Sequence, residues 1–228
     1  MDRKRIWGWW MFDWASQPYF TLGLTFVFGP YFASVASEAY MAQGLVEETA
    51  DARAQALWSR TQWITGLVIA FSAPLLGALA DHAGRRMPWI ILFSIFYVVG
   101  AAALWWLMPN GDFMIGVLFA FGIGLIGAEV TTIFTNALLP DLGDGAEIGQ
   151  LSGTGFAIGY AGGVVALFVM LLLFVEQANG LTLIGLAPPF GLDAEAREGT
   201  RAVGPFIAVW YLIFMIPFFL WIREAPRP

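Results

Sequence analysis

Residues 61–111 read TQWITGLVIAFSAPLLGALADHAGRRMPWIILFSIFYVVGAAALWWLMPNG, and this stretch decides the fold. Two uncharged segments, 61–80 and 87–111, are separated by residues 81–86, which hold every Asp, His and Arg of the stretch. About 20 consecutive apolar residues span the hydrocarbon core of a bilayer, and a charge at its centre costs roughly 2.5–3.5 kcal/mol. The pattern therefore predicts two membrane helices joined by a short polar turn.

The rest of the 228-residue chain has the same character. Hydrophobic residues make up 59% of it and charged residues 12%, whereas soluble domains have about 25% charged residues. Further uncharged windows cover 14–37, 148–175 and 202–222, and the window 113–140 is interrupted only by Glu129. We therefore expect an all-α membrane protein with one domain over residues 1–228. Its transmembrane helices are expected at about 14–37, 58–80, 88–108, 113–139, 149–175 and 203–222, with loops 38–57 and 177–202 outside the cytoplasm.

The composition also excludes several classes of protein. Without cysteine there is no disulfide scaffold and no thiolate zinc site, and a single histidine leaves little for a metal cluster. A net charge of −6 argues against a nucleic-acid partner, which needs clustered Lys and Arg. The sequence has no Ser/His/Asp grouping and no phosphate-binding loop followed by lysine, so we expect neither an enzyme nor a cofactor or metal site.

Six crossings place both ends of the chain on one side of the membrane, and the Lys and Arg count decides which side. Seven basic residues fall on the side of the termini and four on the other. The seven are Arg3, Lys4, Arg5, Arg85, Arg86, Arg223 and Arg227, and the four are Arg53, Arg60, Arg197 and Arg201. We therefore expect an integral protein of a bacterial cytoplasmic (inner) membrane with both termini in the cytoplasm.

The turn between the second and third helices carries a specific motif. Residues 77–88 read GALADHAGRRMP, in which Gly84 suits a positive φ and Pro88 suits the first turn of a helix. The pattern G-x-L-A-D-x-x-G-R-R between two membrane helices resembles the loop signature of the major facilitator superfamily. The resemblance implies a gating loop that latches two halves of a transporter at the cytoplasmic face, formed by Gly77, Asp81, Gly84, Arg85 and Arg86.

Three further segments narrow the resemblance to one branch. They read MFDWASQ at 11–17, FTNALLPD at 134–141 and SGTGFAIGYAGG at 152–163. Together they resemble the vacuole-effluxer-like branch of the superfamily, whose best-known eukaryotic members are linked to amino-acid efflux from the vacuole. Proteins of that family usually have eleven or twelve helices, so the chain resembles the N-terminal six-helix half alone.

Two lines of polar side chains lie within predicted membrane helices, where an ionisable residue indicates a functional site. The resemblance implies that helices 1 and 4 line the central cavity, which would make both lines part of a substrate path. The alternatives are a structural hydrogen bond between helices for Glu129 and simple hydration near the inner boundary for Asp13. The first line is Asp13, Gln17 and Thr21, and the second is Glu129, Thr132 and Asn136.

Small residues repeat along the fifth predicted helix. Gly155, Gly159 and Gly163 recur at four-residue spacing, which favours close packing of one helix backbone on another. Mobile gating by this glycine-rich helix is the alternative. No basic residue occurs between Arg86 and Arg197, so the resemblance does not imply proton coupling.

A lone six-helix half would expose its polar lines to lipid, where unpaired polar groups are unfavourable. We therefore expect the lipid bilayer and a second half as partners, either a copy of the chain in a homodimer or a separate six-helix half. The expected function is transport of a small polar metabolite by alternating access, with amino acids as one candidate. The alternatives are a non-transporting membrane subunit or assembly factor that docks to another complex, and a fragment without function.

Overall fold

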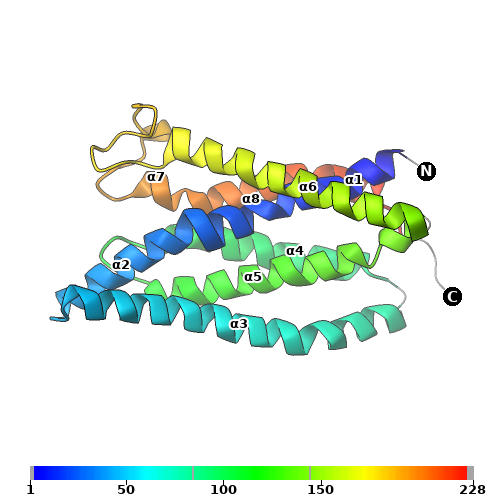
Figure 1. The fold of residues 1–228 in the computed structure, drawn as a ribbon, viewed down its shortest axis with the longest axis horizontal. Coiled ribbons are helices and arrows are strands. Elements are labelled where there is room, and N and C mark those ends of the chain that lie inside the picture. The colour runs from blue at the N-terminus through cyan, green and yellow to red at the C-terminus, as the bar shows by residue number, and fades with distance from the viewer. Residues whose placement is uncertain (1–2, 84, 144, 225–228) are drawn as a thin grey trace.

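The computed structural model describes residues 3–83, 85–143 and 145–224, and for residues 80–83 and 146 it describes the backbone alone. The described residues form a bundle of helices that lie side by side, with the start of the first helix and the end of the last at the same end of the bundle (Figure 1). We call this the termini end and the opposite one the loop end. Six spans are long and apolar enough to cross a membrane: Arg3–Ala42, Glu47–Leu79, Met87–Trp106, Met114–Asp141, Glu147–Phe174 and Glu198–Trp221. The prediction of an all-α protein with six membrane helices is confirmed.

The first span is built from three consecutive helices, α1 Arg3–Pro18, the π-helix η1 Tyr19–Phe26 and α2 Phe28–Ala42. Pro18 has no N–H to donate to the carbonyl of Trp14 four residues earlier. The indole Nε1 of Trp210 donates to that carbonyl instead, at 3.1 Å. A residue from the last span therefore satisfies a backbone group that the proline leaves unpaired.

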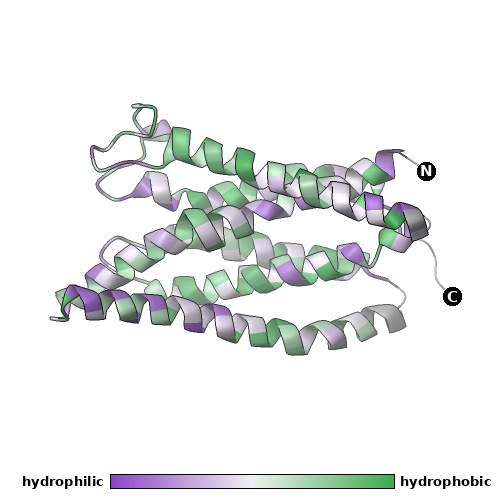
Figure 2. Cartoon of the chain, in the orientation of Figure 1, coloured by the Kyte–Doolittle hydropathy of each residue, from purple (hydrophilic) through white to green (hydrophobic). Residues whose placement is uncertain are grey.

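The connection between the first two spans is much shorter than the loop 38–57 expected from the charges. Helix α2 continues to Ala42, and α3 runs without interruption from Glu47 to Ala83. Gly44, with φ 94°, permits the turn between them, and Glu47 suits the positive N-terminal end of α3. Figure 2 shows hydrophilic residues along the part of α3 beside this turn. The charges therefore mark where the helix leaves the apolar layer, while the helix itself continues.

The remaining spans are regular helices with short irregular ends, and the expected loop 177–202 contains two short helices. The elements are α4 Met87–Ala102, η2 Ala103–Trp106, α5 Met114–Asn136, η3 Leu139–Asp141, α6 Gly145–Val169, η4 Met170–Phe174, η5 Pro189–Gly191, α7 Glu198–Arg201, α8 Val203–Phe214 and α9 Ile216–Trp221. The fold differs from the predicted boundaries mainly at helix ends, which extend past the uncharged windows.

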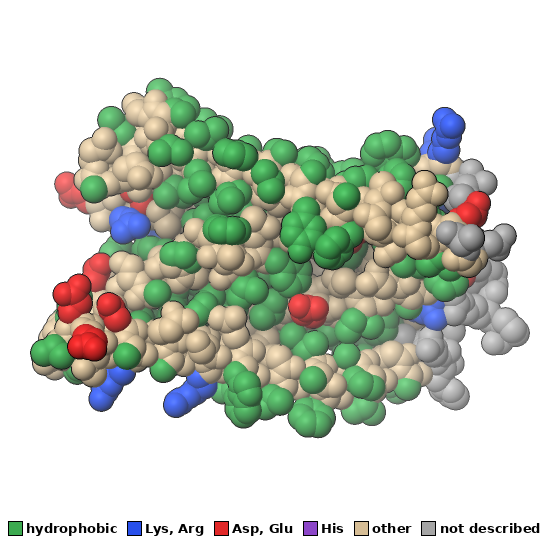
Figure 3. Space-filling view, viewed as in Figure 1, with side chains coloured by type: hydrophobic (Ala, Val, Ile, Leu, Met, Phe, Trp, Pro, Cys, Tyr) green, Lys and Arg blue, Asp and Glu red, His purple; other side chains and the backbone are tan. Residues whose placement is uncertain are grey.

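The helices differ in how deeply they are packed. The apolar window of α5 is 61% buried, whereas that of α3 is 6% buried and contacts mainly α2 and α5. Hydrophobic side chains are spread along the whole length of the face in Figure 3, and acidic and basic side chains gather mainly toward its two ends. This distribution suits a protein whose surroundings are lipid over most of its length.

The core is held by tyrosines that satisfy their hydroxyl groups within the bundle. The hydroxyl of Tyr19 donates to the carbonyl of Phe121 at 2.7 Å, and that of Tyr97 donates to the carbonyl of Ser16 at 3.2 Å. Tyr97 also stacks on Tyr211 with ring centroids 4.0 Å apart. These contacts fix the middle of the first span against α4, α5 and α8, and this position determines where its polar residues point.

Candidate functional site

A polar cleft of about 350 Å³ lies between α1, α5 and α6. Among the described residues that line it, none is Lys, Arg or His, and two are acidic. Five of the six predicted substrate-path residues come together here, while Thr21 lies against Gly163 of α6 instead. The lining is formed by Trp9, Asp13, Ser16, Gln17 and Phe20 from the first span, Glu129, Thr132 and Asn136 from α5, and Ser152, Phe156, Gly159 and Tyr160 from α6.

Helix α1 is fixed at the termini end of the cleft by two tryptophans. The indole of Trp9, which is 2% exposed, donates to the carbonyl of Thr135 in α5 at 3.0 Å. The indole of Trp10 donates to the carbonyl of Leu151 in α6, also at 3.0 Å. Because one helix is tied to both neighbours, the carboxylate of Asp13 is held between α5 and α6.

Helix α5 presents Glu129, Thr132 and Asn136 on one face, as their spacing predicts. The hydroxyl of Thr132 donates to the carbonyl of Ala128 in its own helix at 2.8 Å. Within the described part of the chain, the carboxylates of Asp13 and Glu129 accept no hydrogen bond and form no ion pair. The alternative of a structural interhelical bond from Glu129 is therefore not realised among these residues.

Helix α6 contacts α1 through glycines, as the predicted packing face requires. A Cβ atom added to Gly155 would lie 2.5 Å from Oδ2 of Asp13, and one added to Gly163 would lie 2.5 Å from Oγ1 of Thr21. At Gly159 the added atom would lie 3.2 Å from the backbone carbonyl oxygen of Asp13. The three glycines let the backbones approach closely and leave the neighbouring Phe156 and Tyr160 to line the cleft.

The predicted gating loop is only partly described. Gly84 and the side chain of Asp81 lie outside the described residues, Gly77 has nothing within 4 Å of an added Cβ, and Arg85 is exposed. Arg86 is buried, and its Nη1 donates to the carbonyl of Ala137 at 2.7 Å. One arginine of the motif therefore connects the start of α4 to the end of α5.

The start of α4 also has an acidic partner that the sequence did not reveal. The carboxylate of Glu224 accepts hydrogen bonds from the backbone N–H groups of Arg86 and, at 3.2 Å, of Met87. These are N–H groups that a helix leaves unsatisfied at its N-terminus, where a negative charge is also favoured. The end of the sixth span is thereby tied to the motif loop.

At the loop end, a buried acid joins segments that the sequence showed only as polar loops. Glu176, whose side chain is 2% exposed, accepts from Nε of Arg197 at 2.8 Å and from N–H and Oγ1 of Thr200 at 3.0 and 2.5 Å. The guanidinium of Arg201 lies over Trp105, 4.6 Å from the ring centroid. These contacts close the loop end around α7.

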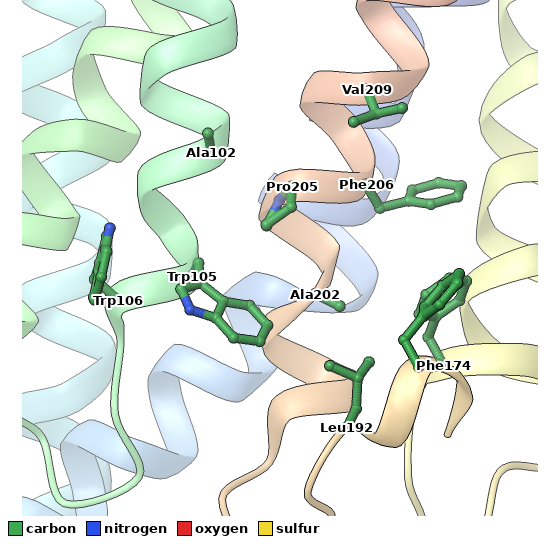
Figure 4. A pocket seen from close by; sticks show the side chains of 10 residues that line it. Ala102, Trp105, Trp106, Phe174, Leu192, Ala202, Pro205, Phe206 and Val209 are labelled. Carbon is green, nitrogen blue, oxygen red and sulfur yellow. The ribbon is translucent and has the colours of Figure 1, made fainter. Parts of the chain in front are cut away.

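A second, larger cavity has different chemistry. It measures about 640 Å³ and lies between η2 and α8, where Trp105, Phe174, Leu192 and Phe206 surround it (Figure 4). Its described lining has no ionisable side chain. An apolar groove of this kind does not recognise a polar solute, so the polar cleft remains the candidate site.

Several lining residues were missed from the sequence, although a signal for them exists. Ser152, Phe156 and Tyr160 repeat every four residues and therefore share one face of α6. Two of the three are aromatic, and the neighbouring glycine repeat led us to interpret this helix as a packing element alone. Ser16, next to Gln17, was not predicted to line the cleft because hydroxyl side chains are common in membrane helices and do not by themselves indicate a site.

Comparison with known proteins finds one family and one curated relative that resemble the chain. A sequence model described as "Vacuole effluxer Atg22 like" matches residues 1–150. The protein named "Uncharacterized MFS-type transporter YxiO" of Bacillus subtilis (strain 168) is 26% identical over 212 residues, which are 92% of this chain and 44% of that protein. The chain thus spans less than half of that relative's length. No solved structure matches the chain. With six apolar spans, these similarities support an integral membrane protein.

Proposed function

Because the chain belongs to the vacuole effluxer Atg22-like family, we propose that it forms one half of a major-facilitator-type transporter. The transporter moves a small polar metabolite by alternating access, and amino acids are one candidate cargo. It works in a bacterial cytoplasmic membrane with the termini end in the cytoplasm, and it catalyses no chemical reaction. A second half, either another copy of the chain or a separate six-helix unit, forms the opposite wall.

The observation that carries this proposal is the polar cleft. Carboxylates within membrane-spanning helices are strongly unfavourable unless they face water or protein, so two without a partner among the described residues indicate more than helix packing. Asp13 and Glu129 do face a cleft of about 350 Å³, together with Gln17 and Asn136. These amide and carboxylate groups give a polar solute several hydrogen-bonding partners.

One feature supports a second half: helix α3 is almost unburied by its own chain. The spans cross the membrane an even number of times, so a second six-helix unit in the same orientation is related to the first by an axis along the membrane normal. Such an arrangement places the cleft at the centre of the assembly.

A flux assay with a charge-neutral variant tests the proposal. The purified chain is reconstituted into lipid vesicles, and efflux of radiolabelled amino acids, small amines and small organic acids is followed with and without a pH gradient. We expect flux of at least one solute, and at least a tenfold lower rate for Glu129→Gln. Glu38→Gln, at an exposed residue of α2 outside the cleft, serves as the matched control with the parental rate.

Two results would overturn the proposal. The first is a folded Glu129→Gln variant that carries every solute at the parental rate. The second is the absence of flux combined with stable co-purification in a larger membrane complex, which would favour the docking subunit. The oligomeric state is measured on the same preparation by mass determination in lipid nanodiscs, where a monodisperse monomer would contradict the homodimer and leave the separate six-helix unit as the second half.

A further inference from the structure

The described lining of the cleft has acidic side chains and no basic ones. Asp13 and Glu129 both line it, their carboxylates have no hydrogen-bond or ion-pair partner among the described residues, and no basic residue joins them in the wall. A carboxylate in such a place is stabilised by an opposite charge more strongly than in water, because the effective dielectric constant is lower. The cleft therefore attracts a cation.

The rest of the wall suits an organic cation. Phe156 and Tyr160 contact each other edge to face with ring centroids 4.8 Å apart, and they are 64% and 52% exposed. Phe20 contributes a third aromatic ring from the first span. The faces of aromatic rings attract ammonium groups and also cover apolar carbon, so these rings match both parts of an alkyl or aryl amine.

The same wall is poorly suited to a metal ion. Calcium takes six to eight oxygen ligands, and magnesium requires a nearly ideal octahedral set. Among the described residues, no group of three or more His, Cys, Asp and Glu is placed to hold a metal. A volume of about 350 Å³ is also at the lower end of the range for small-molecule sites, which is roughly 300–1,000 Å³.

We propose that the cleft binds a small protonated amine, with its charge held by the carboxylates of Asp13 and Glu129 and its carbon part against Phe156 and Tyr160. This inference rests on the proposed function, since it names the class of cargo for the same site. Gln17 and Asn136, which also line the cleft, supply amide oxygens that accept hydrogen bonds from the remaining N–H groups of the ammonium.

Three phenyl compounds of similar size and different charge test the inference. Benzylammonium, benzyl alcohol and benzoate are titrated by calorimetry into the chain in lipid nanodiscs, with empty nanodiscs as the blank. We expect benzylammonium to bind at least tenfold more tightly than either of the others. Benzyl alcohol or benzoate binding as tightly as benzylammonium would overturn the proposal, and so would a failure of benzylammonium to bind above the blank.

Variants locate the bound charge. Glu129→Gln and Asp13→Asn keep the shapes of the side chains and are each expected to weaken benzylammonium binding at least tenfold, while Glu38→Gln leaves it unchanged. Unchanged binding in both cleft variants would overturn the assignment to this site. The order of the three probes on the parental chain requires no variant, so it decides the question even where a variant fails to fold.

The binding experiment and the flux assay can fail independently of each other. Flux of neutral or anionic solutes that depends on Glu129, without preference for benzylammonium, would overturn the amine inference and leave the transporter in place. Tight benzylammonium binding in a homodimeric preparation that moves no solute would support the amine site and contradict transport.

Discussion

Gly155 leaves no room for a side chain beside Asp13, because a Cβ at position 155 would lie 2.5 Å from the acid's Oδ2. The same added atom would also lie 2.5 Å from the ring of Trp9, which ties α1 to α5. The position of the cleft carboxylate therefore depends on a residue without a side chain in the facing helix. This dependence gives the first prediction.

Gly155→Ala will destabilise the bundle by about 1–3 kcal/mol, since overpacking a tight contact forces neighbouring atoms to move. Thermal unfolding in detergent micelles measures the effect. Gly153→Ala on the same helix is the matched control, because nothing lies within 4 Å of an added Cβ there. Equal unfolding temperatures for both variants would contradict the close α1–α6 contact.

Trp210→Phe will lower stability by about 1 kcal/mol, the lower end of the range for leaving a buried acceptor unpaired, because this hydrogen bond is only partly buried. The phenyl ring keeps most of the stacking on Trp14, whose ring centroid is 5.8 Å away, but it loses the N–H that reaches the Trp14 carbonyl. Trp106→Phe is the control, at a tryptophan that is 56% exposed. Thermal unfolding of both variants provides the comparison.

A double-mutant cycle with Pro18 identifies the cause of that effect. Pro18→Ala restores an N–H four residues after Trp14, so the carbonyl has a partner within its own helix. We expect Trp210→Phe to be less destabilising in the Pro18→Ala background than in the parental chain. Strict additivity of the two changes would show that the indole acts through packing alone.

Glu224→Ala will loosen the start of α4. The carboxylate accepts from the N–H groups of Arg86 and Met87, and loss of a helix N-terminal acceptor costs about 1 kcal/mol. Hydrogen exchange at these two amides should accelerate roughly fivefold, as this free energy implies. Glu38→Ala serves as the control. Unchanged exchange at both amides would show that the Glu224 carboxylate does not stabilise the start of α4.

Glu176→Ala will destabilise the loop end by about 1–3 kcal/mol because it leaves the N–H of Thr200 unpaired. Glu195→Ala is the control in the same segment, at an exposed residue. Limited proteolysis between residues 177 and 197 reports the change, and we expect faster cleavage in Glu176→Ala alone. The same cleavage rate in both variants would assign no role to the buried acid.

The sequence predicted the features that repeat along a single helix. Uncharged windows gave the six spans, and the spacing of Glu129, Thr132 and Asn136 gave their common face, because helical geometry alone determines both. The glycine spacing likewise gave a packing face, although not its partner α1.

Contacts between distant segments could not be predicted in this way. Trp210 pairs with a carbonyl 196 residues earlier, and Glu224 with N–H groups more than 130 residues earlier. No local pattern encodes such partners, since they depend on how the spans are arranged. The length of α3 was missed for a different reason: charged residues end an apolar window without ending a helix, and Glu47 at its start even favours the helix.

Glycines at 155, 159, 162 and 163 leave no layer of side chains between α1 and α6 over the length of the cleft. Because the two helices pack this closely, sliding or tilting one against the other would bring their atoms into collision, so α1 and α6 are expected to move as one rigid unit. A rearrangement that exposes the cleft first to one side of the membrane and then to the other would therefore change the contacts between this unit and the remaining helices. Asp13, which lies at this contact, would keep its position relative to both helices.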